Sequence, residues 1–157
     1  MKIIIRPETS SEYNEVDNVI YEAFSEEYGT ETGKFMKQHF IQERLKATYI
    51  PELSLVAVLG NGKIVGEVAI HETDIITDKE NVTELTLSQC AVLPEYRKQG
   101  IMRMLVEEGL KIAKNMGYGA VFLGGNTMLY SRFGFESSYK YGIYHKDREK
   151  WGDEGFM

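Results

Sequence analysis

A glycine turn with basic neighbours is the part of the sequence best suited to bind an anion. Gly100 lies between an apolar run that Pro94 ends and an amphipathic helical pattern that starts at Ile101. The first N–H groups of a helix have no intrahelical partners, and the helix dipole adds partial positive charge there. Three basic side chains lie near the same turn, at Arg97, Lys98 and Arg103. The stretch therefore predicts a cradle for a phosphate or pyrophosphate group.

The same stretch resembles the Q/R-x-x-G-x-G/A signature of the GNAT superfamily of N-acetyltransferases, carried here by Arg97, Gly100 and Met102. A second block, residues 130–135 (Tyr-Ser-Arg-Phe-Gly-Phe), is similar to the Y-x-x-x-G-F block near the C-terminus of that superfamily. Residues 124–135 most resemble a group of small bacterial predicted acetyltransferases with a G-D-P-x-Y-Y-x-x-F-G-F run. The resemblance covers most of the chain and implies acetyl transfer from acetyl-CoA to an amine.

The resemblance also assigns residues to the cofactor. It implies that backbone groups of residues 90–92 bind the pantetheine arm and that residues 97–103 hold the pyrophosphate. Met102 departs from the signature, which has Gly or Ala at this position. We expect its long side chain to weaken cofactor binding without abolishing it, since Met readily adopts helical geometry. The expected cofactor contacts are Cys90, Ala91, Val92, Arg97, Lys98, Gln99, Gly100, Ile101, Met102, Arg103 and Asn126.

Attack of an amine on a thioester requires a base, because an alkylamine has a pKa of ~10.4 and is charged at neutral pH. Glu84 is one candidate: it lies two residues before Thr86, where some GNAT relatives carry a glutamate, and on the same strand face. His71 is the other, with a more suitable ordinary pKa of ~6.5. Both can equally be solvated strand residues. Glu67 and Glu72 have only their proximity to the strands in favour of this role.

The family pattern gives Tyr130 a role at the leaving group. In Y-x-x-x-G-F the tyrosine hydroxyl approaches the thioester sulfur, so the resemblance implies a hydrogen bond from Tyr130 to the departing thiolate. Full proton transfer is uphill by ~1.5 pKa units, because a phenol has a pKa of ~10 and a thiol ~8.5. A purely structural tyrosine is the alternative. Backbone N–H groups near Ala91 or Val92 are the expected donors to the carbonyl oxygen.

The sequence has no pattern for a metal site or a serine nucleophile. Its three histidines are scattered, and one cysteine, Cys90, cannot form a ligand cluster or an intramolecular disulfide. Ser88 lacks the glycines of a nucleophile elbow. Cys90 lies in an apolar strand, where we expect it to belong to the core.

Length and composition predict one domain over residues 1–157, with 43% hydrophobic and 27% charged residues. No apolar run approaches the ~20 residues of a membrane span, and residues 1–7 do not suit a signal peptide, so we expect a cytoplasmic protein without a membrane partner. The net charge of −6 disfavours nucleic acid and favours a cationic partner. Acidic residues on the first helices form either a solvated face or a surface for an amine: Glu8, Glu12, Glu15, Asp17, Glu22, Glu26, Glu27 and Glu31.

Hydrophobic periodicity and turn residues predict strands alternating with helices. Thr9 and Glu12 have the spacing of a capping box, and Asn61-Gly62 is a strong hairpin signal. The expected strands cover residues 2–6, 53–59, 63–71, 82–93, 120–123, 136–139 and 141–145, and the expected helices cover residues 9–29, 34–47, 99–116 and 126–133. The helix over 34–47 has flanking glycines and suggests a mobile lid beside the amine.

This order, β-α-α-β-β-β-α-β-α-β-β, predicts an α+β fold with a mixed sheet. It is also the order of the GNAT fold, in which the central strands, here 82–93 and 120–123, splay apart to admit the pantetheine arm. A parallel crossover through the helix over 99–116 is the natural connection between them.

Together these features predict an acetyl-CoA-dependent N-acetyltransferase that acts on a primary amine of a small molecule or peptide. The alternative is a non-catalytic acyl-CoA-binding sensor or interaction module, because of Met102 and the missing carboxylate at Thr86. An RNA-binding domain is disfavoured by the charge. Trp151, Phe156 and exposed strand edges allow a homodimer.

Overall fold

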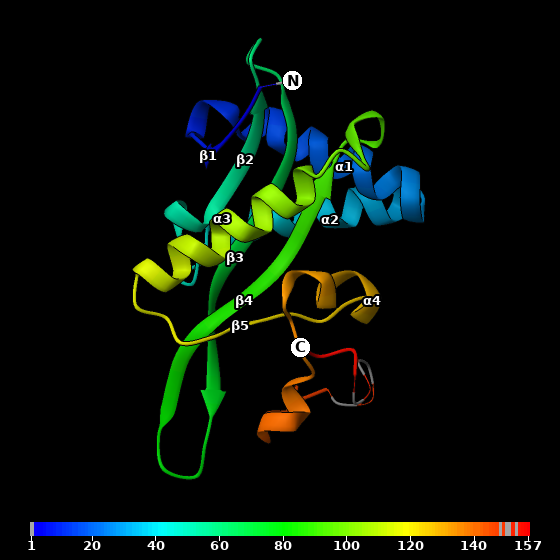
Figure 1. Cartoon of the computed structure of the whole chain (residues 1–157). Coiled ribbons are helices and arrows are strands. Elements are labelled where there is room, and N and C mark those ends of the chain that lie inside the picture. The colour runs from blue at the N-terminus through cyan, green and yellow to red at the C-terminus, as the bar shows by residue number, and fades with distance from the viewer. Residues whose placement is uncertain (1, 148, 150–151, 153) are drawn as a thin grey trace.

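The described residues form one five-stranded sheet with helices on both faces (Figure 1). The computed structural model describes residues 2–147, 149, 152 and 154–157. The strands are β1 (Ile3–Pro7), β2 (Ser54–Leu59), β3 (Ile64–Ile76), β4 (Asn81–Val92) and β5 (Val121–Phe122). The helices are α1 (Tyr13–Tyr28), α2 (Thr30–Glu43), α3 (Ile101–Asn115) and α4 (Thr127–Tyr130).

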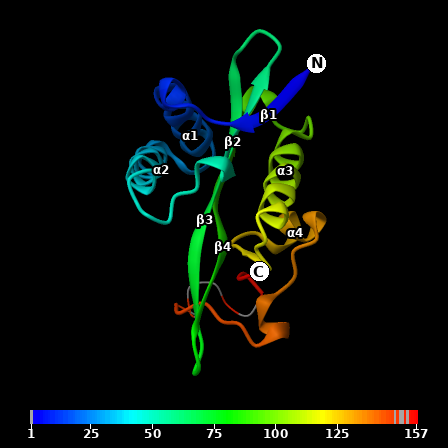
Figure 2. The same cartoon turned by 90° about the vertical axis from the view of Figure 1, so that its left-hand side faces the viewer.

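The sheet order is β1-β2-β3-β4-β5, antiparallel except for the parallel β4/β5 pair. Helices α1 and α2 lie on one face and α3 on the other (Figure 2). Strand β2 is buried along its whole length, as expected for a strand covered on both sides. The predicted α+β fold with a mixed sheet is confirmed.

The first two helices follow each other with almost no connection. Gly29 ends α1 with a φ of 92°, a conformation that favours glycine, and α2 begins at the next residue. The helices touch closely, because a Cβ atom on Gly33 would lie 2.6 Å from the Tyr21 carbonyl oxygen. The second helix therefore starts before the predicted Lys34 and ends at Glu43 rather than Ala47.

A buried ion cluster holds the end of α2 in place. The Arg44 guanidinium donates to Glu8 through Nε at 2.9 Å and Nη2 at 2.8 Å, and to Asp17 through Nη1 at 2.6 Å. It also lies 4.2 Å from the ring centres of Tyr13 and Phe40. The guanidinium thus joins α2 to α1 and to the segment that follows β1.

Strands β3 and β4 make a long hairpin that extends past the helices (Figure 1). Strand β3 continues to Ile76, beyond the predicted end at His71, because its last residues pair with the start of β4 as far as Asn81. Within the hairpin Ala69 pairs with Gln89 and Ile70 with Leu87. Ser88 is therefore an extra residue, a β-bulge in the middle of β4.

The β4/β5 pair separates after two residues. Leu85 pairs with Val121 and Thr86 with Phe122, after which β4 runs on to Val92 without β5 beside it. The crossover through α3 and the splay of the central strands agree with the predicted fold.

The two strands predicted over 136–139 and 141–145 are wrong. Residues Ser138–Tyr141 form a 3-10 turn, and Gly142, with a φ of 72°, redirects the chain. The Ser138 hydroxyl donates to the carbonyls of Ile143 at 2.9 Å and Phe156 at 3.1 Å, which takes the place of a strand ladder.

Residues 155–157 instead pair with the segment that follows β5. Leu123 and Met157 exchange two backbone hydrogen bonds of 2.8 Å, and the Gly125 N–H donates to the Gly155 carbonyl at 2.9 Å. Phe156 stacks on Phe122 within the same chain, with ring centres 5.7 Å apart. Trp151 lies outside the described residues.

Candidate cofactor and active site

A groove of about 610 Å³ lies where β4 and β5 separate. One wall is the β4 backbone from Ser88 to Val92, and the opposite wall is the segment from Gly124 through α4. The turn before α3 closes one end, and the last turns of α1 border the groove from the other face of the sheet. A concave, largely apolar site of this volume suits a small ligand or one arm of a larger one.

The turn before α3 presents free backbone donors to the groove. Lys98 has a φ of 60°, the one positive φ of a non-glycine residue in the described chain, and Gly100 has a φ of 80°. The first intrahelical hydrogen bond runs from the Met104 N–H to the Gly100 carbonyl. The N–H groups of residues 101–103 therefore have no intrahelical acceptor and remain available to an anion.

The three basic side chains of this turn differ in what they contact. Arg97 points away from the turn: its guanidinium donates to the carbonyls of Val92 at 3.2 Å and Ala23 at 2.8 Å, and to the Glu26 carboxylate at 2.5 Å. Its expected full charge for the phosphates is thus already engaged by protein groups. Lys98 lies exposed at the groove with no ion-pair partner among the described residues.

Arg103 lies along the same side of the groove as α4. Its Nη1 donates to Glu107 at 2.9 Å, and its guanidinium sits 5.1 Å from the ring centre of Phe133. Lys98 thus presents its positive charge at the groove, whereas Arg103 shares its charge with Glu107.

The remaining expected cofactor residues lie around the groove with one exception. Met102 lines it with a side chain that also packs on the core, and Asn126 lines it while its Oδ1 caps α4 by accepting from the Leu129 N–H at 3.2 Å. Gln99 does not line the groove; its side chain donates to the Glu95 carbonyl. The groove-lining residues of this set are Cys90, Ala91, Val92, Arg97, Lys98, Gly100, Ile101, Met102, Arg103 and Asn126.

Tyr130 faces the groove from α4. Its ring packs edge-on against Phe133 and Phe135, with ring centres 6.2 and 6.0 Å away. Burial raises the pKa of the Tyr130 phenol well above its usual range, and the neighbouring Cys90 thiol adds to the effect. Its hydroxyl has no hydrogen-bond partner in the part of the chain that the structure describes, so it can donate to a ligand.

A family model for the acetyltransferase (GNAT) domain matches residues 4–138. The chain belongs to the GNAT acetyltransferase family. The prediction made from Arg97, Gly100 and the residues around Tyr130 is thus confirmed at the level of the superfamily.

Individual relatives agree with this assignment. The uncharacterized N-acetyltransferase YhbS of Escherichia coli is 38% identical over 99 residues, which are 63% of this chain and 56% of YhbS. The chain thus matches little more than half the length of this curated relative. A structure of YhbS in complex with CoA has a TM-score of 0.70 and 28% identity, covering 89% of this chain and 72% of the other. A GNAT family acetyltransferase of Brucella melitensis in complex with acetyl-CoA has a TM-score of 0.70 and 25% identity, covering 87% and 84%.

Neither candidate base lines the groove of this GNAT domain. The Glu84 carboxylate accepts 2.9 Å hydrogen bonds from the N–H groups of Gly119 and Ala120, and so positions the start of β5. His71 lies beside α2, with its Nε2 3.7 Å from the Glu43 carboxylate. Burial lowers the pKa of the His71 imidazole. The structure separates both residues from Tyr130.

The end of α1 and the first turns of α2 supply groove residues that the sequence did not single out. They are Ala23, Phe24, Tyr28 and Met36; Glu27, one of the acidic residues named above as a possible surface for an amine, lines the groove beside them. Glu27 and Tyr28 line the same groove as Tyr130. The sequence signal that pointed this way was the run of acidic residues in the first helices, together with the expectation that the second helix borders the amine.

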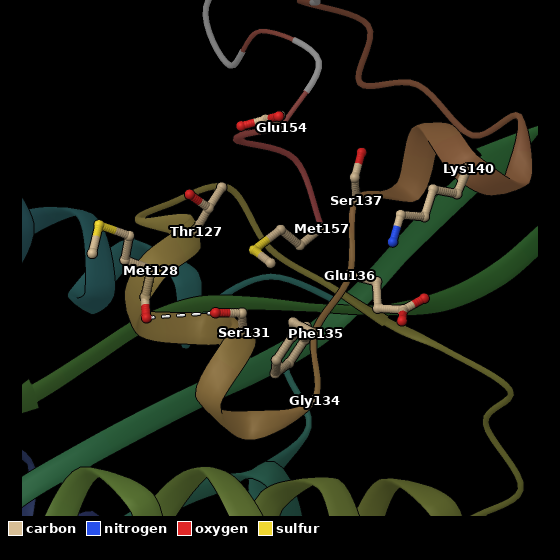
Figure 3. Close-up of a pocket in the computed structure, with 10 residues that line it drawn as sticks. All are labelled: Thr127, Met128, Ser131, Gly134, Phe135, Glu136, Ser137, Lys140, Glu154 and Met157. Carbon is tan, nitrogen blue, oxygen red and sulfur yellow. Dashed lines mark hydrogen bonds between the residues drawn. The ribbon is translucent and has the colours of Figure 1, made fainter.

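A second hollow of about 520 Å³ lies on the far side of α4 (Figure 3). Most of its lining side chains are exposed, including Met128, Glu136 and Lys140, and its floor is Met157. In its lining, the Ser131 hydroxyl donates to the Met128 carbonyl at 3.5 Å (Figure 3). It is an open surface depression without convergent polar groups.

The described residues contain no group of three or more side chains that could hold a metal ion. Within the same residues, none of the helices combines the length and the apolar character needed to cross a membrane.

Proposed function

We propose that this GNAT domain transfers an acetyl group from acetyl-CoA to a primary amine of a small molecule or peptide. The observation that carries the proposal is the left-handed turn at Lys98 and Gly100, which opens α3 at the end of a groove that Tyr130 faces. Relatives of similar fold bind acetyl-CoA or CoA, which supports the same cofactor here.

The residues of the turn fit a pyrophosphate. A Cβ atom on Gly100 would meet nothing within 4 Å, so the surface above the turn is open to a ligand. The free N–H groups of residues 101–103 and the charges of Lys98 and Arg103 would hold the phosphates. Among the described residues, the β4 edge after Thr86 has no strand partner on the β5 side, so its backbone groups on that side, apart from the Val92 carbonyl that Arg97 contacts, would be available to the amides of a pantetheine arm.

Acetyl transfer forms a bond from the amine nitrogen to the acetyl carbon and breaks the bond from that carbon to sulfur. Backbone N–H groups of β4 near Ala91 would donate to the carbonyl oxygen as negative charge develops on it. The Tyr130 hydroxyl would donate a hydrogen bond to the departing thiolate. The raised pKa of Tyr130 makes full proton transfer still less favourable, so the phenol keeps its proton.

The amine would enter past the end of α1. Glu27 is the groove-lining carboxylate on that side, and it lies 3.6 Å from Arg97, which Glu26 also contacts. Two carboxylates thus share one guanidinium, so a net negative charge remains where a cationic amine would arrive. We assign Glu27 to attract the amine and to accept its proton through water, and Phe24, Tyr28 and Met36 to contact its carbon skeleton.

A panel of amines and amine-bearing peptides, assayed for thiol release from acetyl-CoA, tests the proposal. We expect turnover with at least one primary amine and a lower rate with the Glu27→Gln protein at the same acetyl-CoA concentration. The matched control is Glu22→Gln, which removes a carboxylate of the same helix that does not line the groove. Tight binding of acetyl-CoA without turnover of any amine would favour the acyl-CoA sensor instead.

A further inference from the structure

The middle of the sheet contains a carboxyl group that the proposed reaction does not use. Glu67 on β3 pairs with Ala91 on β4, in the wall of the groove, and is 1% exposed. Both of its carboxyl oxygens are shielded from solvent and have no hydrogen-bond partner among the described residues. A charged carboxylate in such a place is strongly destabilised unless a cation or several donors accompany it.

Among the described residues, Glu67 has no ion-pair partner. The guanidinium near it belongs to Arg44, which already binds Glu8 and Asp17. Burial, and after it the Glu8 carboxylate, raises the pKa of the Glu67 carboxyl, while the Gln89 amide, the Arg44 guanidinium and the Ala91 backbone oppose the rise. A third carboxylate beside a single guanidinium would leave two uncompensated negative charges in the core, which favours the neutral acid.

Gln89 is the neighbour that can satisfy this acid. It lies two residues before Ala91 and therefore on the same face of β4, and it pairs with Ala69. It is 4% exposed, and its Nε2 and Oε1 also lack partners among the described residues. Burial raises the pKa of the Glu67 carboxyl, and the Gln89 amide opposes that rise. Two adjacent buried polar side chains with unused atoms can satisfy each other directly or through one internal water.

We propose that Glu67 is a neutral carboxylic acid that hydrogen-bonds to the Gln89 amide and so positions the bulged segment of β4 that forms the wall of the groove. The effect of this pair on catalysis rests on the proposed function, whereas the neutral state of Glu67 does not. Gln89 adjoins the extra residue Ser88, where the ladder changes register and β4 has one residue without a partner opposite it on β3. The Glu67–Gln89 pair joins this bulge to β3, so it fixes the direction of the N–H groups that would meet the thioester carbonyl.

Variants at position 67 separate a positioning acid from a base. Glu67→Gln keeps the size and the ability to donate to Gln89 but cannot take up a proton, and we expect kcat within about threefold of wild type. Glu67→Leu leaves Gln89 without a partner, and we expect kcat to fall about 10- to 100-fold, because small displacements of catalytic groups are costly. The double variant Glu67→Leu/Gln89→Leu removes both polar groups, so it should recover thermal stability without recovering kcat. A loss of kcat in Glu67→Gln as large as in Glu67→Leu would overturn the proposal.

The pH dependence gives a second readout that a merely structural role would not change. We expect the ratio of Glu67→Gln to wild-type kcat to stay constant near neutral pH and to rise at alkaline pH, where the wild-type acid loses its proton and its donor. A ratio that falls as the pH rises would mean that Glu67 works as an ionised base, and the positioning role would be wrong.

Infrared spectroscopy tests the neutral acid without any reaction. The wild-type protein without CoA, at pH 7.5, should show a carboxylic-acid C=O band that is missing in Glu67→Gln and present in Glu84→Gln. An absence of this band would show that Glu67 is ionised and would reject the inference. If no amine is acetylated, the proposed function fails, while the band still decides the state of Glu67.

Discussion

The ring of Tyr130 lies directly on the backbone of Gly125: a Cβ atom on Gly125 would be 2.9 Å from the ring. Gly125→Ala should therefore push Tyr130 out of position. We expect kcat to fall at least about 10-fold, because a displacement of this size misplaces the hydroxyl. Steady-state kinetics measures the fall in kcat. A CoA titration measures the affinity for CoA, which should change little. Gly60→Ala is the control, because a Cβ atom at Gly60 meets nothing within 4 Å.

Tyr130→Phe removes only the hydroxyl. We expect kcat to fall up to about 100-fold, the lower end of the range for a positioned acid, with CoA affinity and melting temperature nearly unchanged. Because the pKa of Tyr130 is raised, the phenol stays protonated between pH 6 and 9. The ratio of wild-type to variant kcat should therefore be constant over this pH range. Full turnover with a lowered melting temperature would make Tyr130 a structural residue.

Gly100 gives a charge test of the anion cradle. Gly100→Asp and Gly100→Asn have nearly the same shape and both tolerate a φ of 80° better than most residues. Only aspartate places a negative charge at the phosphates. Calorimetry should show CoA binding at least about 10-fold weaker for Gly100→Asp than for Gly100→Asn, equal to about 1.4 kcal/mol. Equal affinities in two folded variants would place the cofactor phosphates elsewhere.

Met102 occupies a position where the family signature has a smaller residue. Its side chain lines the groove, so Met102→Ala should tighten CoA binding if the thioether crowds the phosphates, and Ala also suits the first turn of a helix. We expect an improvement of a few-fold in calorimetry. Weaker binding by Met102→Ala would show that the thioether makes a favourable contact with the cofactor.

Glu67→Gln should change stability in a pH-dependent way. Burial raises the pKa of the native Glu67 carboxyl well above its ordinary value. The native state then keeps a proton that the unfolded state releases above pH ~4.3, so wild-type stability falls as the pH rises from there toward the native pKa. The Glu67→Gln protein does not lose stability in this way. Its free energy of unfolding should therefore rise relative to that of wild type by about 1.4 kcal/mol for each pH unit in that window.

Scanning calorimetry between pH 4 and 8 measures this difference. Glu12→Gln is the control of opposite sign, because the hydrogen bond from Arg6 lowers the pKa of Glu12 to about 2. That carboxylate stabilises the native state above the ordinary glutamate pKa and loses the effect as the pH falls toward 2. Glu12→Gln should therefore be the less stable protein at neutral pH, and equal melting temperatures of Glu67→Gln and wild type at all pH values would contradict a neutral Glu67.

Local signals allowed much of the site to be predicted from the sequence. The turn at Gly100 and the helix after it depend on neighbouring residues, as does the short helix predicted to begin at Asn126. The resemblance to the GNAT fold implied that these elements meet at one site. Tyr130 was placed by its spacing from Gly134, and it faces the groove as expected.

The parts that sequence reasoning missed depend on contacts between distant segments. Arg97 binds the Ala23 carbonyl, 74 residues away, and nothing near Arg97 in the sequence indicates this. Glu84 was placed on the correct strand, but its carboxylate is engaged by the start of β5. The strands expected over 136–145 had suitable residue types, yet residues 155–157 pair with the segment that follows β5 instead.

The contacts of Arg97 have a thermodynamic consequence for the order in which ligands bind. One guanidinium holds the end of β4 through Val92 and the end of α1 through Ala23 and Glu26, while its own backbone begins the turn at the groove. A cofactor that orders this turn would also order the helix beside the amine. Coupling of this kind is reciprocal. If bound acetyl-CoA raises the affinity for the amine by some factor, the bound amine must raise the affinity for acetyl-CoA by the same factor.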